Sequence, residues 1–404
     1  METNNRSDPF SFVKESCFYL FLRASIQIIM NTLRMADIQA QYHRLRPEID
    51  AAVAAVLESG EFINGKEVPL FSRELSDWMG GTRVIPCANG TDALQVALMA
   101  LDLEPGDEVI TTNFTFISTV EVLVLLRLKP VLADVDPTTF NIDATQIRSL
   151  ITPRTRALIP AHLFGQPADM DPILAIAREN NLVILEDNAQ SLGATYRHSD
   201  GSNRMAGDIG LLSTTSFFPT KPLACYGDGG AIMTRDAKLA EKLAMIVNHG
   251  AKVKYHHEII GVNSRLDTLQ AAILRVNLRH LNSFIEARQA VARHYDQLLE
   301  KTPGLRVPAT GRGCSHVYHQ YTLVLEEYDR DKVQQQLKEA GIPAMIYYPV
   351  PLSLQRAFAS AGYREGDFPV TERLCRQVLS LPVHTEMTPD QIEYIASSLK
   401  KTLT

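Results

Sequence analysis

Short apolar runs recur through the middle of the chain without the two-residue alternation that half-exposed strands show. They occupy residues 109–110, 131–135, 157–161 and 182–185, and stretches with helical spacing separate most of them. Strands that are apolar on both faces are typical of a parallel sheet covered by helices on both sides. The pattern therefore predicts an α/β fold with a mostly parallel sheet.

The flanking segments extend this pattern. Residues 47–60 have helical spacing, with Pro47 expected in the first helical turn and Gly60 at its end. A short apolar segment then passes through Gly90 into a helical stretch, which predicts a strand, turn and helix unit. Further strands are expected at residues 211–218 and 231–233.

A long helical segment, residues 266–299, is expected to connect two domains. We assign residues 35–282 to a large domain and residues 283–404 to a smaller C-terminal domain. The smaller domain is expected to mix strands, such as residues 321–325, with helices, such as residues 330–340.

The first 34 residues are set apart from this organisation. Lys14, Glu15 and Arg23 interrupt their apolar part, so no stretch reaches the ~20 apolar residues of a membrane span. No short apolar core precedes a small-residue cleavage site. We interpret residues 1–34 as a loosely attached extension, or as the product of an upstream start codon with Met30 or Met35 as the functional start.

Composition excludes several classes of function. The formal net charge is −6, and no basic run of five or more residues occurs, which argues against nucleic-acid binding. The five cysteines are scattered and lack the spacing of zinc ligands, which predicts no metal site and fits a reducing cytoplasm. They are Cys17, Cys87, Cys225, Cys314 and Cys375.

Lys221 follows an apolar segment and lies between Pro219 and Pro222, an unfavourable place for a solvated charge. A lysine whose charged form is disfavoured by burial can be deprotonated near neutral pH and can react with an aldehyde. Pyridoxal phosphate supplies such an aldehyde, and it also needs a carboxylate beside its pyridine nitrogen, a role that Asp187 can fill. The alternative is a surface lysine after a turn and an acidic strand end.

The turn at Gly90 and Thr91 predicts an anion site, because the N–H groups at a helix N-terminus and the helix dipole attract a phosphate. The simpler alternative is that Thr91 only caps its helix. The glycine motifs of nucleotide hydrolases and of nicotinamide-binding proteins are not found in the sequence.

Five motifs then occur in order along the chain. They are CANGTDAL at 87–94, EDNAQ at 186–190, SFFPTK at 216–221, GDGG at 227–230 and GVNSRLD at 261–267. With them the chain resembles the DegT/DnrJ/EryC1/StrS nucleotide-sugar aminotransferases of fold type I, from about residue 35 to the C-terminus. The resemblance implies a mostly parallel seven-stranded sheet in the large domain, a smaller C-terminal α+β domain, and pyridoxal 5'-phosphate as cofactor.

The resemblance also implies roles for single residues. Lys221 would form the covalent bond to the cofactor and, once released, would move the proton during transfer. Asp187 would form an ion pair with the pyridine nitrogen, and Gln190 would bond the ring hydroxyl. Retention of Lys221 argues against the related dehydratases, in which histidine replaces it.

Phe116 would stack on the cofactor ring, or it could be plain core. Gly90, Thr91 and Ser216 would hold the phosphate, although Ser216 could be a buried hydroxyl satisfied by backbone. Asn263 would reach the phosphate from the neighbouring subunit, which implies a homodimer with shared active sites; its alternative is a cap of the long helix.

Within the family, the segments at 256–257 and 261–267 look most similar to enzymes that aminate C3 of a UDP-linked 3-keto-uronic acid. Arg265 would then bind a carboxylate on the sugar or on the glutamate donor, because its planar fork suits one; the alternative is a surface ion pair with Asp267 or another acidic residue. Tyr347 and Tyr348 are expected to contact the sugar. Relatives often carry histidine at the positions of Ser353 and Tyr347, and these departures weaken the expectation about the sugar.

These observations predict a cytoplasmic, homodimeric aminotransferase that moves an amino group from glutamate to a 3-keto nucleotide sugar for surface polysaccharide. The preferred substrate is a UDP-2-acetamido-3-keto-hexuronate. A dTDP-3-keto-6-deoxyhexose is the close alternative. A cofactor-binding regulator or sensor without turnover, and a lyase, are alternatives from other classes.

Overall fold

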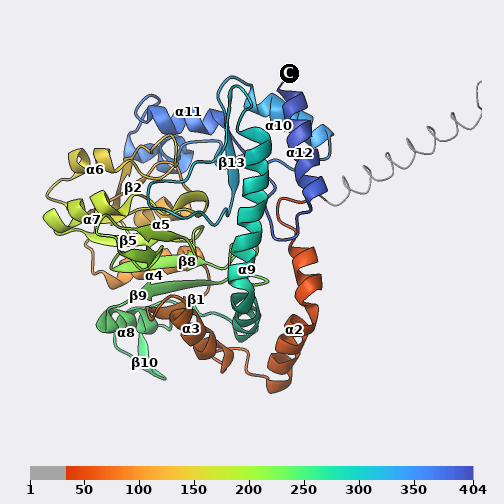
Figure 1. The fold of residues 1–404 in the computed structure, drawn as a ribbon. Coiled ribbons are helices and arrows are strands. Elements are labelled where there is room, and N and C mark those ends of the chain that lie inside the picture. The colour runs from red at the N-terminus through yellow and green to blue at the C-terminus, as the bar shows by residue number, and fades with distance from the viewer. Residues whose placement is uncertain (1–32, 404) are drawn as a thin grey trace, which may run out of the picture.

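The computed structural model describes residues 33–403. At its centre lies a seven-stranded sheet with the order β1-β9-β8-β5-β4-β2-β3 (Figure 1). Strand β9 runs antiparallel to β1 and β8, and the other neighbouring pairs are parallel. The strands are β1 (Arg83–Cys87), β2 (Glu108–Thr112), β3 (Lys129–Ala133), β4 (Thr155–Ile159), β5 (Val183–Asp187), β8 (Leu212–Ser216) and β9 (Gly230–Thr234). The predicted mostly parallel sheet is confirmed.

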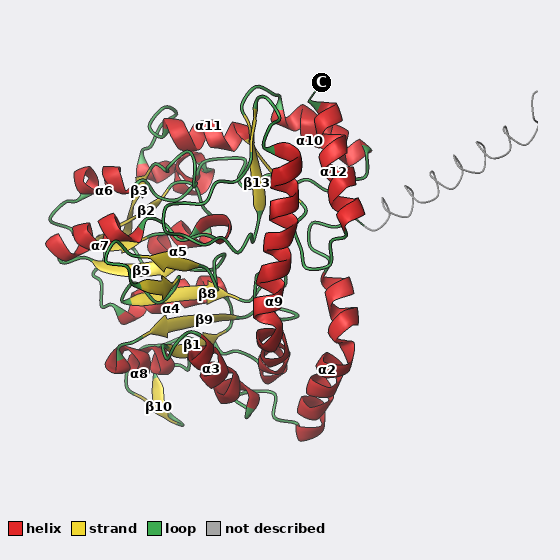
Figure 2. Ribbon diagram, in the orientation of Figure 1, coloured by secondary structure: helices red, strands yellow, loops and turns green. Residues whose placement is uncertain are grey.

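Helices cover this sheet on its two faces, as Figure 2 shows. Helix α4 packs against β8 and β9, whereas α3 packs against β1. Every residue of β2 is buried, which explains its lack of alternation, since both of its faces meet helices. The helices of this part are α2 (Ile38–Ser59), α3 (Glu67–Trp78), α4 (Gly90–Ala100), α5 (Ser118–Leu125), α6 (Ala144–Leu150), α7 (Met170–Glu179) and α8 (Ala237–Ile246).

A second sheet of three antiparallel strands forms the core of the C-terminal part, with the order β12-β13-β14. Its elements are β12 (Leu305–Arg306), β13 (Tyr321–Leu325), α10 (Arg330–Glu339), α11 (Pro369–Gln377), β14 (Val378–Leu381) and α12 (Pro389–Thr402). Helix α9 (Thr268–Leu299) runs without interruption alongside both parts (Figure 1). Because α9 passes through residues 282 and 283, the domain boundary placed there stays a prediction.

Two hairpins and three short 3-10 helices were not anticipated. Their bounds are β6 (Thr195–Arg197), β7 (Asn203–Met205), β10 (Ala251–Val253), β11 (His256–His257), η1 (Leu163–Gly165), η2 (Leu352–Leu354) and η3 (Arg356–Ala361). These segments are too short for a periodic pattern to reveal them.

The first described helix differs from its prediction. Helix α2 begins at Ile38, and the preceding Asp37 caps it by accepting a hydrogen bond from the backbone N–H of Ala40. Pro47 therefore lies inside the helix and not in its first turn. Leu45 and Ile49, on either side of Pro47, pack against apolar side chains of α9, and Pro47 itself faces solvent. Tertiary packing therefore carries the helix past a residue that usually interrupts one.

Expectations for residues 1–32, including a start at Met30, lie outside the described residues. Leu33 packs against the core of the C-terminal part. Within residues 33–403, no helix has both the length and the apolar character required to cross a membrane.

Asp134, directly after β3, connects the central sheet to the C-terminal part. Its buried carboxylate accepts hydrogen bonds from the backbone N–H groups of Val370 and Thr371, at 2.9 and 2.8 Å, and from the Thr371 hydroxyl at 2.7 Å. Both residues lie in the first turn of α11, where N–H groups lack partners within the helix. The negative charge also suits the positive end of the helix dipole.

We expect Asp134→Asn to lower the free energy of unfolding by about 2 kcal/mol, because an amide cannot accept all three buried hydrogen bonds. Urea unfolding followed by circular dichroism measures this loss. Asp143→Asn is the matched control, since Asp143 caps α6 in a half-buried place and asparagine also caps helices well, so its loss should stay below about 1 kcal/mol. Equal losses in the two variants would contradict the role of Asp134.

Candidate active site

A cavity of about 520 Å³ lies where β4, β5 and β8 end and α4 begins. This is the usual place for a ligand in an α/β sheet, since the carboxyl ends of parallel strands and the N-termini of the following helices meet there. Among the predicted residues, nine line this cavity: Gly90, Thr91, Phe116, Asp187, Gln190, Ser216, Lys221 and the pair Tyr347 and Tyr348 on the C-terminal side. Its volume is in the range of small-molecule sites.

Asp187 occupies the last position of β5, and its carboxylate is held from two sides. One oxygen accepts a hydrogen bond from the Thr119 hydroxyl at 2.7 Å, and the other accepts from the Ala189 N–H at 3.2 Å. The side chain is 8% exposed. The carboxylate is therefore fixed in place while it borders the cavity.

Lys221 lies in the loop between β8 and β9 and is half-buried at the same cavity. Burial lowers the pKa of its amine to about 8, and the negative charge of Asp187 acts in the opposite direction. An amine with this pKa is partly uncharged near neutral pH and can act as a nucleophile or as a base. The alternative of an ordinary surface lysine is thus contradicted.

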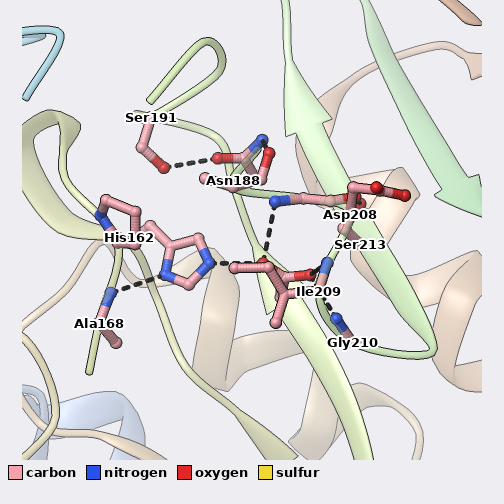
Figure 3. Close-up of polar contacts among 12 residues, drawn as sticks. His162, Ala168, Asn188, Ser191, Asp208, Ile209, Gly210 and Ser213 are labelled. Atoms are coloured by element: carbon pink, nitrogen blue, oxygen red, sulfur yellow. Dashed lines mark hydrogen bonds and ion pairs between the residues drawn. The ribbon is translucent and has the colours of Figure 1, made fainter. Parts of the chain in front are cut away.

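Behind Asp187, the preceding residue Glu186 forms a buried pair with His162. Figure 3 shows the surroundings of His162, with Ala168 on one side and Ile209 and Gly210 on the other. The Glu186 carboxylate accepts from His162 Nε2 at 2.8 Å and from backbone N–H groups at residues 207, 209 and 210. Burial alone would raise the pKa of Glu186, but these hydrogen bonds outweigh it and the pKa is lowered. His162 Nδ1 accepts from the Ala168 N–H, so the ring proton lies on Nε2 and the imidazole is neutral.

This pair holds the ends of β4 and β5 together. The backbone N–H of His162 also donates to the Asp187 carbonyl at 3.0 Å. Because every polar atom of the buried pair has a partner, the backbone that carries Asp187 is rigid.

The start of α4 forms a second part of the cavity wall. A Cβ atom on Gly90 would lie 2.7 Å from the Ser216 Cβ, so only glycine lets α4 approach the end of β8 this closely. The Asn89 side chain caps the helix by accepting from the Asp92 N–H at 2.8 Å. The alternative in which Thr91 only caps the helix is therefore wrong.

Three hydroxyl groups face this helix start. Thr91 Oγ1 and Ser118 Oγ lie 2.7 Å apart, and Ser216 Oγ accepts a hydrogen bond from the Phe218 N–H at 3.3 Å. Because Ser216 only accepts this bond, its own proton is free for an occupant of the cavity. Hydroxyl donors at a helix N-terminus can bind a phosphate group.

Gln190 is oriented from both ends of its amide. Its oxygen accepts from the Phe164 N–H at 2.8 Å, and its nitrogen donates to the Tyr348 hydroxyl at 3.1 Å. A second N–H of Gln190 is left to meet an occupant. Burial raises the pKa of the Tyr348 phenol, so Tyr348 stays protonated.

The Phe116 side chain is 54% exposed and borders the cavity, with its ring centre 6.3 Å from that of Tyr348. A core residue would be buried, so the plain-core alternative is contradicted. An exposed ring at the cavity is available to stack on a flat ligand.

Asn263 and Arg265 do not line this cavity. Asn263 is exposed, and α9 is preceded by Asp267 at its N-cap, so Asn263 does not cap that helix. Within the described residues Arg265 forms no ion pair, which excludes the expected alternative with Asp267, and its buried Nε has no hydrogen-bond partner. Both side chains are therefore available to groups outside the cavity of their own chain.

Ser353 lies away from the cavity, in contrast to the expectation that it contributes to sugar recognition. It is buried, donates its backbone N–H to Asn113 Oδ1 at 2.7 Å, and accepts from Asn113 Nδ2 at 3.0 Å. This departure from relatives concerns packing between the two parts of the chain. The other departure, Tyr347, borders the cavity.

Sequence reasoning missed several cavity residues. Ser118, at the start of α5, lines the cavity, and the next residue, Thr119, donates to Asp187. A Ser/Thr pair at a helix start was the available signal. His319 and Gln320 reach the cavity from the segment before β13, and only the packing of the two parts brings them there.

We expect the acylation rate of Lys221 in the cofactor-free protein to rise about tenfold per pH unit up to about pH 8, and then to level off, because only the uncharged amine reacts. Peptide mass spectrometry after timed labelling measures this profile. Exposed Lys238, on α8 and outside the cavity, is the control. Parallel profiles for the two lysines would contradict the low pKa of Lys221.

Several known proteins are similar to this chain over most of its length. Residues 43–400 match the DegT/DnrJ/EryC1/StrS aminotransferase family. The chain is 44% identical to UDP-2-acetamido-2-deoxy-3-oxo-D-glucuronate aminotransferase of Pseudomonas aeruginosa, over 91% of this chain and 99% of that protein. It is 45% identical to a protein of Geobacillus stearothermophilus described as a pleiotropic regulatory protein, over 90% and 97% of the two chains.

The crystal structure of S. venezuelae DesV has the same fold, with a TM-score of 0.87, 39% sequence identity, and coverage of 91% of this chain and 98% of that one. The expected fold type I architecture is confirmed. The chain therefore belongs to the DegT/DnrJ/EryC1/StrS aminotransferase family and is a nucleotide-sugar aminotransferase.

Proposed function

We propose that this protein transfers the amino group of glutamate to C3 of a 3-keto nucleotide sugar, with UDP-2-acetamido-3-keto-hexuronate as the preferred acceptor. The observation that carries the chemistry is the opposition of Lys221 and Asp187 across one cavity whose wall includes a helix N-terminus. The 44% identical uronate enzyme supports the choice of sugar. Surface polysaccharide synthesis is the corresponding pathway.

Aminotransferases of this family depend on pyridoxal phosphate. The cavity residues fit this cofactor, since a low-pKa amine, an immobile carboxylate and a hydroxyl-lined helix start occur together. When bound, the cofactor supplies an aldehyde that carries the amino group and a ring that withdraws electrons from the reacting carbon. In this proposal Gly90, Thr91 and Ser216 hold the phosphate, Gln190 binds the ring hydroxyl and Phe116 covers the ring face.

Asp187 would keep a proton on the pyridine nitrogen. Its two hydrogen bonds, from Thr119 and Ala189, fix the carboxylate without adding a positive charge, so its negative charge remains available to that proton. The buried pair of Glu186 and His162 behind it keeps the Asp187 backbone from moving away from the cavity.

Lys221 Nζ would move the proton between the substrate carbon and the cofactor. A pKa of about 8 suits this role, because a group that both takes and gives a proton works best when its pKa lies near the working pH. Two half-reactions, first with glutamate and then with the sugar, would use the same amine.

We further propose a homodimer in which Asn263 and Arg265 serve the neighbouring subunit. Both residues lie outside the cavity of their own chain, and Arg265 has no carboxylate partner among the described residues. Exposed apolar side chains near them also suit a second copy: Val253, Tyr255 and Ile260. The cysteines within the described part of the chain are free thiols, which supports a cytoplasmic location.

The proposal predicts two spectral changes in protein reconstituted with pyridoxal phosphate. Glutamate should abolish the visible absorbance of the bound cofactor, and the UDP-linked 3-keto-uronate should restore it while an amino sugar appears in the mass spectrum. Lys221→Ala should show neither change. If only a dTDP-linked deoxyhexose restores the absorbance, the deoxyhexose replaces the uronate as the proposed substrate. If glutamate leaves the absorbance unchanged, the alternative of a cofactor-binding regulator is favoured.

Arg265→Ala should lower kcat/KM for the uronate roughly tenfold to a hundredfold, because a charged hydrogen bond to the sugar carboxylate is lost. The loss on a deoxyhexose, which has no carboxylate, should be much smaller. Arg279→Ala is the matched control, since Arg279 is exposed and pairs with Glu48. Equal losses by Arg265→Ala on both sugars would contradict the uronate assignment.

A further inference from the structure

Thr119 is a buried hydroxyl residue that contacts the Asp187 carboxylate from outside the cavity. It lies in the first turn of α5, is fully buried, and donates to Asp187 Oδ2 at 2.7 Å. Its neighbours Thr115, Phe116 and Ser118 line the cavity, whereas Thr119 does not. Any effect of Thr119 on the chemistry of the cavity therefore passes through Asp187.

The direction of this hydrogen bond follows from the two groups. An ionised carboxylate only accepts, so the proton belongs to Thr119. The Thr115 hydroxyl is 3.5 Å from the Thr119 hydroxyl, too far to compete for that proton. A hydroxyl that donates to a charged carboxylate forms one of the stronger hydrogen bonds in a protein. Thr119 thus holds one carboxylate oxygen, while the Ala189 N–H holds the other at the longer distance of 3.2 Å.

Both contacts are needed to fix the plane of the Asp187 carboxylate. A carboxylate held by one oxygen can still turn about its Cβ–Cγ bond, whereas one held by both oxygens cannot. Asp187 and Lys221 line the same cavity and form no ion pair among the described residues. The charge of Asp187 nevertheless acts on the Lys221 amine. The carboxylate is therefore near the amine but held out of contact with it.

Other titratable groups share the cavity without taking this part. Besides Asp187 and Lys221, they are His162, Asp228, His319, Tyr347 and Tyr348. Burial raises the pKa of both phenols and holds the pKa of the His319 imidazole well below its usual value, so these three groups are uncharged near neutral pH. The His162 imidazole is also neutral, and Asp228 is exposed to solvent. The charge that acts on the Lys221 amine is that of Asp187.

We propose that Thr119 is a positioning residue for the reactive pair: its hydrogen bond to Asp187 Oδ2 keeps the carboxylate available to the pyridine nitrogen and stops it from turning onto the Lys221 ammonium. The inference rests on the proposed roles of Asp187 and Lys221. Its consequence is that the cofactor-free protein keeps a reactive amine beside a fixed carboxylate, because the two groups are prevented from neutralising each other.

Thr111, on β2, provides a matched control. It is also fully buried, and its hydroxyl also donates one hydrogen bond of 2.7 Å, to the Ile159 carbonyl. It does not line the cavity and does not contact Asp187. Substitution of either threonine by valine keeps the shape of the side chain and removes one buried hydrogen bond, so a purely structural role predicts similar effects of the two changes.

The test measures Lys221 in the cofactor-free protein, by the pH dependence of its acylation and by the rate at which it takes up pyridoxal phosphate. Thr119→Val should raise the pKa of Lys221 by about one unit, because a carboxylate that can approach the ammonium favours the charged form. At pH 7 both rates should then fall about tenfold, in proportion to the uncharged amine. Thr111→Val should leave both quantities at their wild-type values.

A double-mutant cycle shows whether Thr119 acts through Asp187. Asp187→Asn alone should lower the pKa of Lys221, since it removes the charge that raises it. Thr119→Val added to Asp187→Asn should produce no further shift, because the carboxylate that Thr119 holds is then absent. A further rise in the double variant would show another route to Lys221 and would overturn the inference.

Two smaller side chains keep the test valid if Thr119→Val folds poorly. Thr119→Ser retains the hydroxyl and should keep the wild-type titration and uptake rate. Thr119→Ala lacks the hydroxyl and should behave as the valine variant does. Both changes remove the buried methyl group, so a difference between them reports the hydrogen bond and not the packing.

Unchanged Lys221 titration and uptake in the valine and alanine variants would overturn the inference and leave the proposed function intact. So would equal effects of Thr119→Ser and Thr119→Ala, or equal effects of Thr119→Val and Thr111→Val. Wild-type protein that takes up no pyridoxal phosphate would contradict the proposed function itself, and this inference with it.

Discussion

The burial of the Lys221 amine opposite the Asp187 carboxylate is the constraint on which the site depends. Burial disfavours the ammonium and brings its pKa to about 8, while the nearby carboxylate limits that shift. If the two groups formed a close ion pair, the lysine would lose its reactivity and the carboxylate its availability. Thr119 and Ala189 hold the Asp187 carboxylate in place through hydrogen bonds.

Rigidity around these two groups comes from buried polar atoms that are fully paired. Glu186 points away from the cavity and binds His162 together with three backbone N–H groups, so the ends of β4 and β5 move as one unit. A buried carboxylate without these partners would be strongly destabilising. The same residues that stabilise the sheet therefore fix the geometry needed for chemistry.

The C-terminal part completes the cavity. Tyr347, Tyr348 and His319 all come from it, and Asp134 and Asn113 connect it to the central sheet through buried hydrogen bonds. Ser353 belongs to this connection. Of the two departures from relatives, only Tyr347 borders the cavity.

The sequence by itself determined the α/β class and the mostly parallel strands, because unbroken apolar runs are local features. Motifs such as SFFPTK and EDNAQ also predicted that Lys221 and Asp187 belong to one site, and both residues line the same cavity. It also placed Gly90, whose lack of a side chain is required where α4 meets β8. Only the tertiary structure decided that Asn89 caps α4, that Pro47 lies within α2, that Ser353 is remote from the cavity, and that His319 borders it. Those outcomes depend on contacts between segments far apart in the chain, and no local pattern encodes which surfaces will meet.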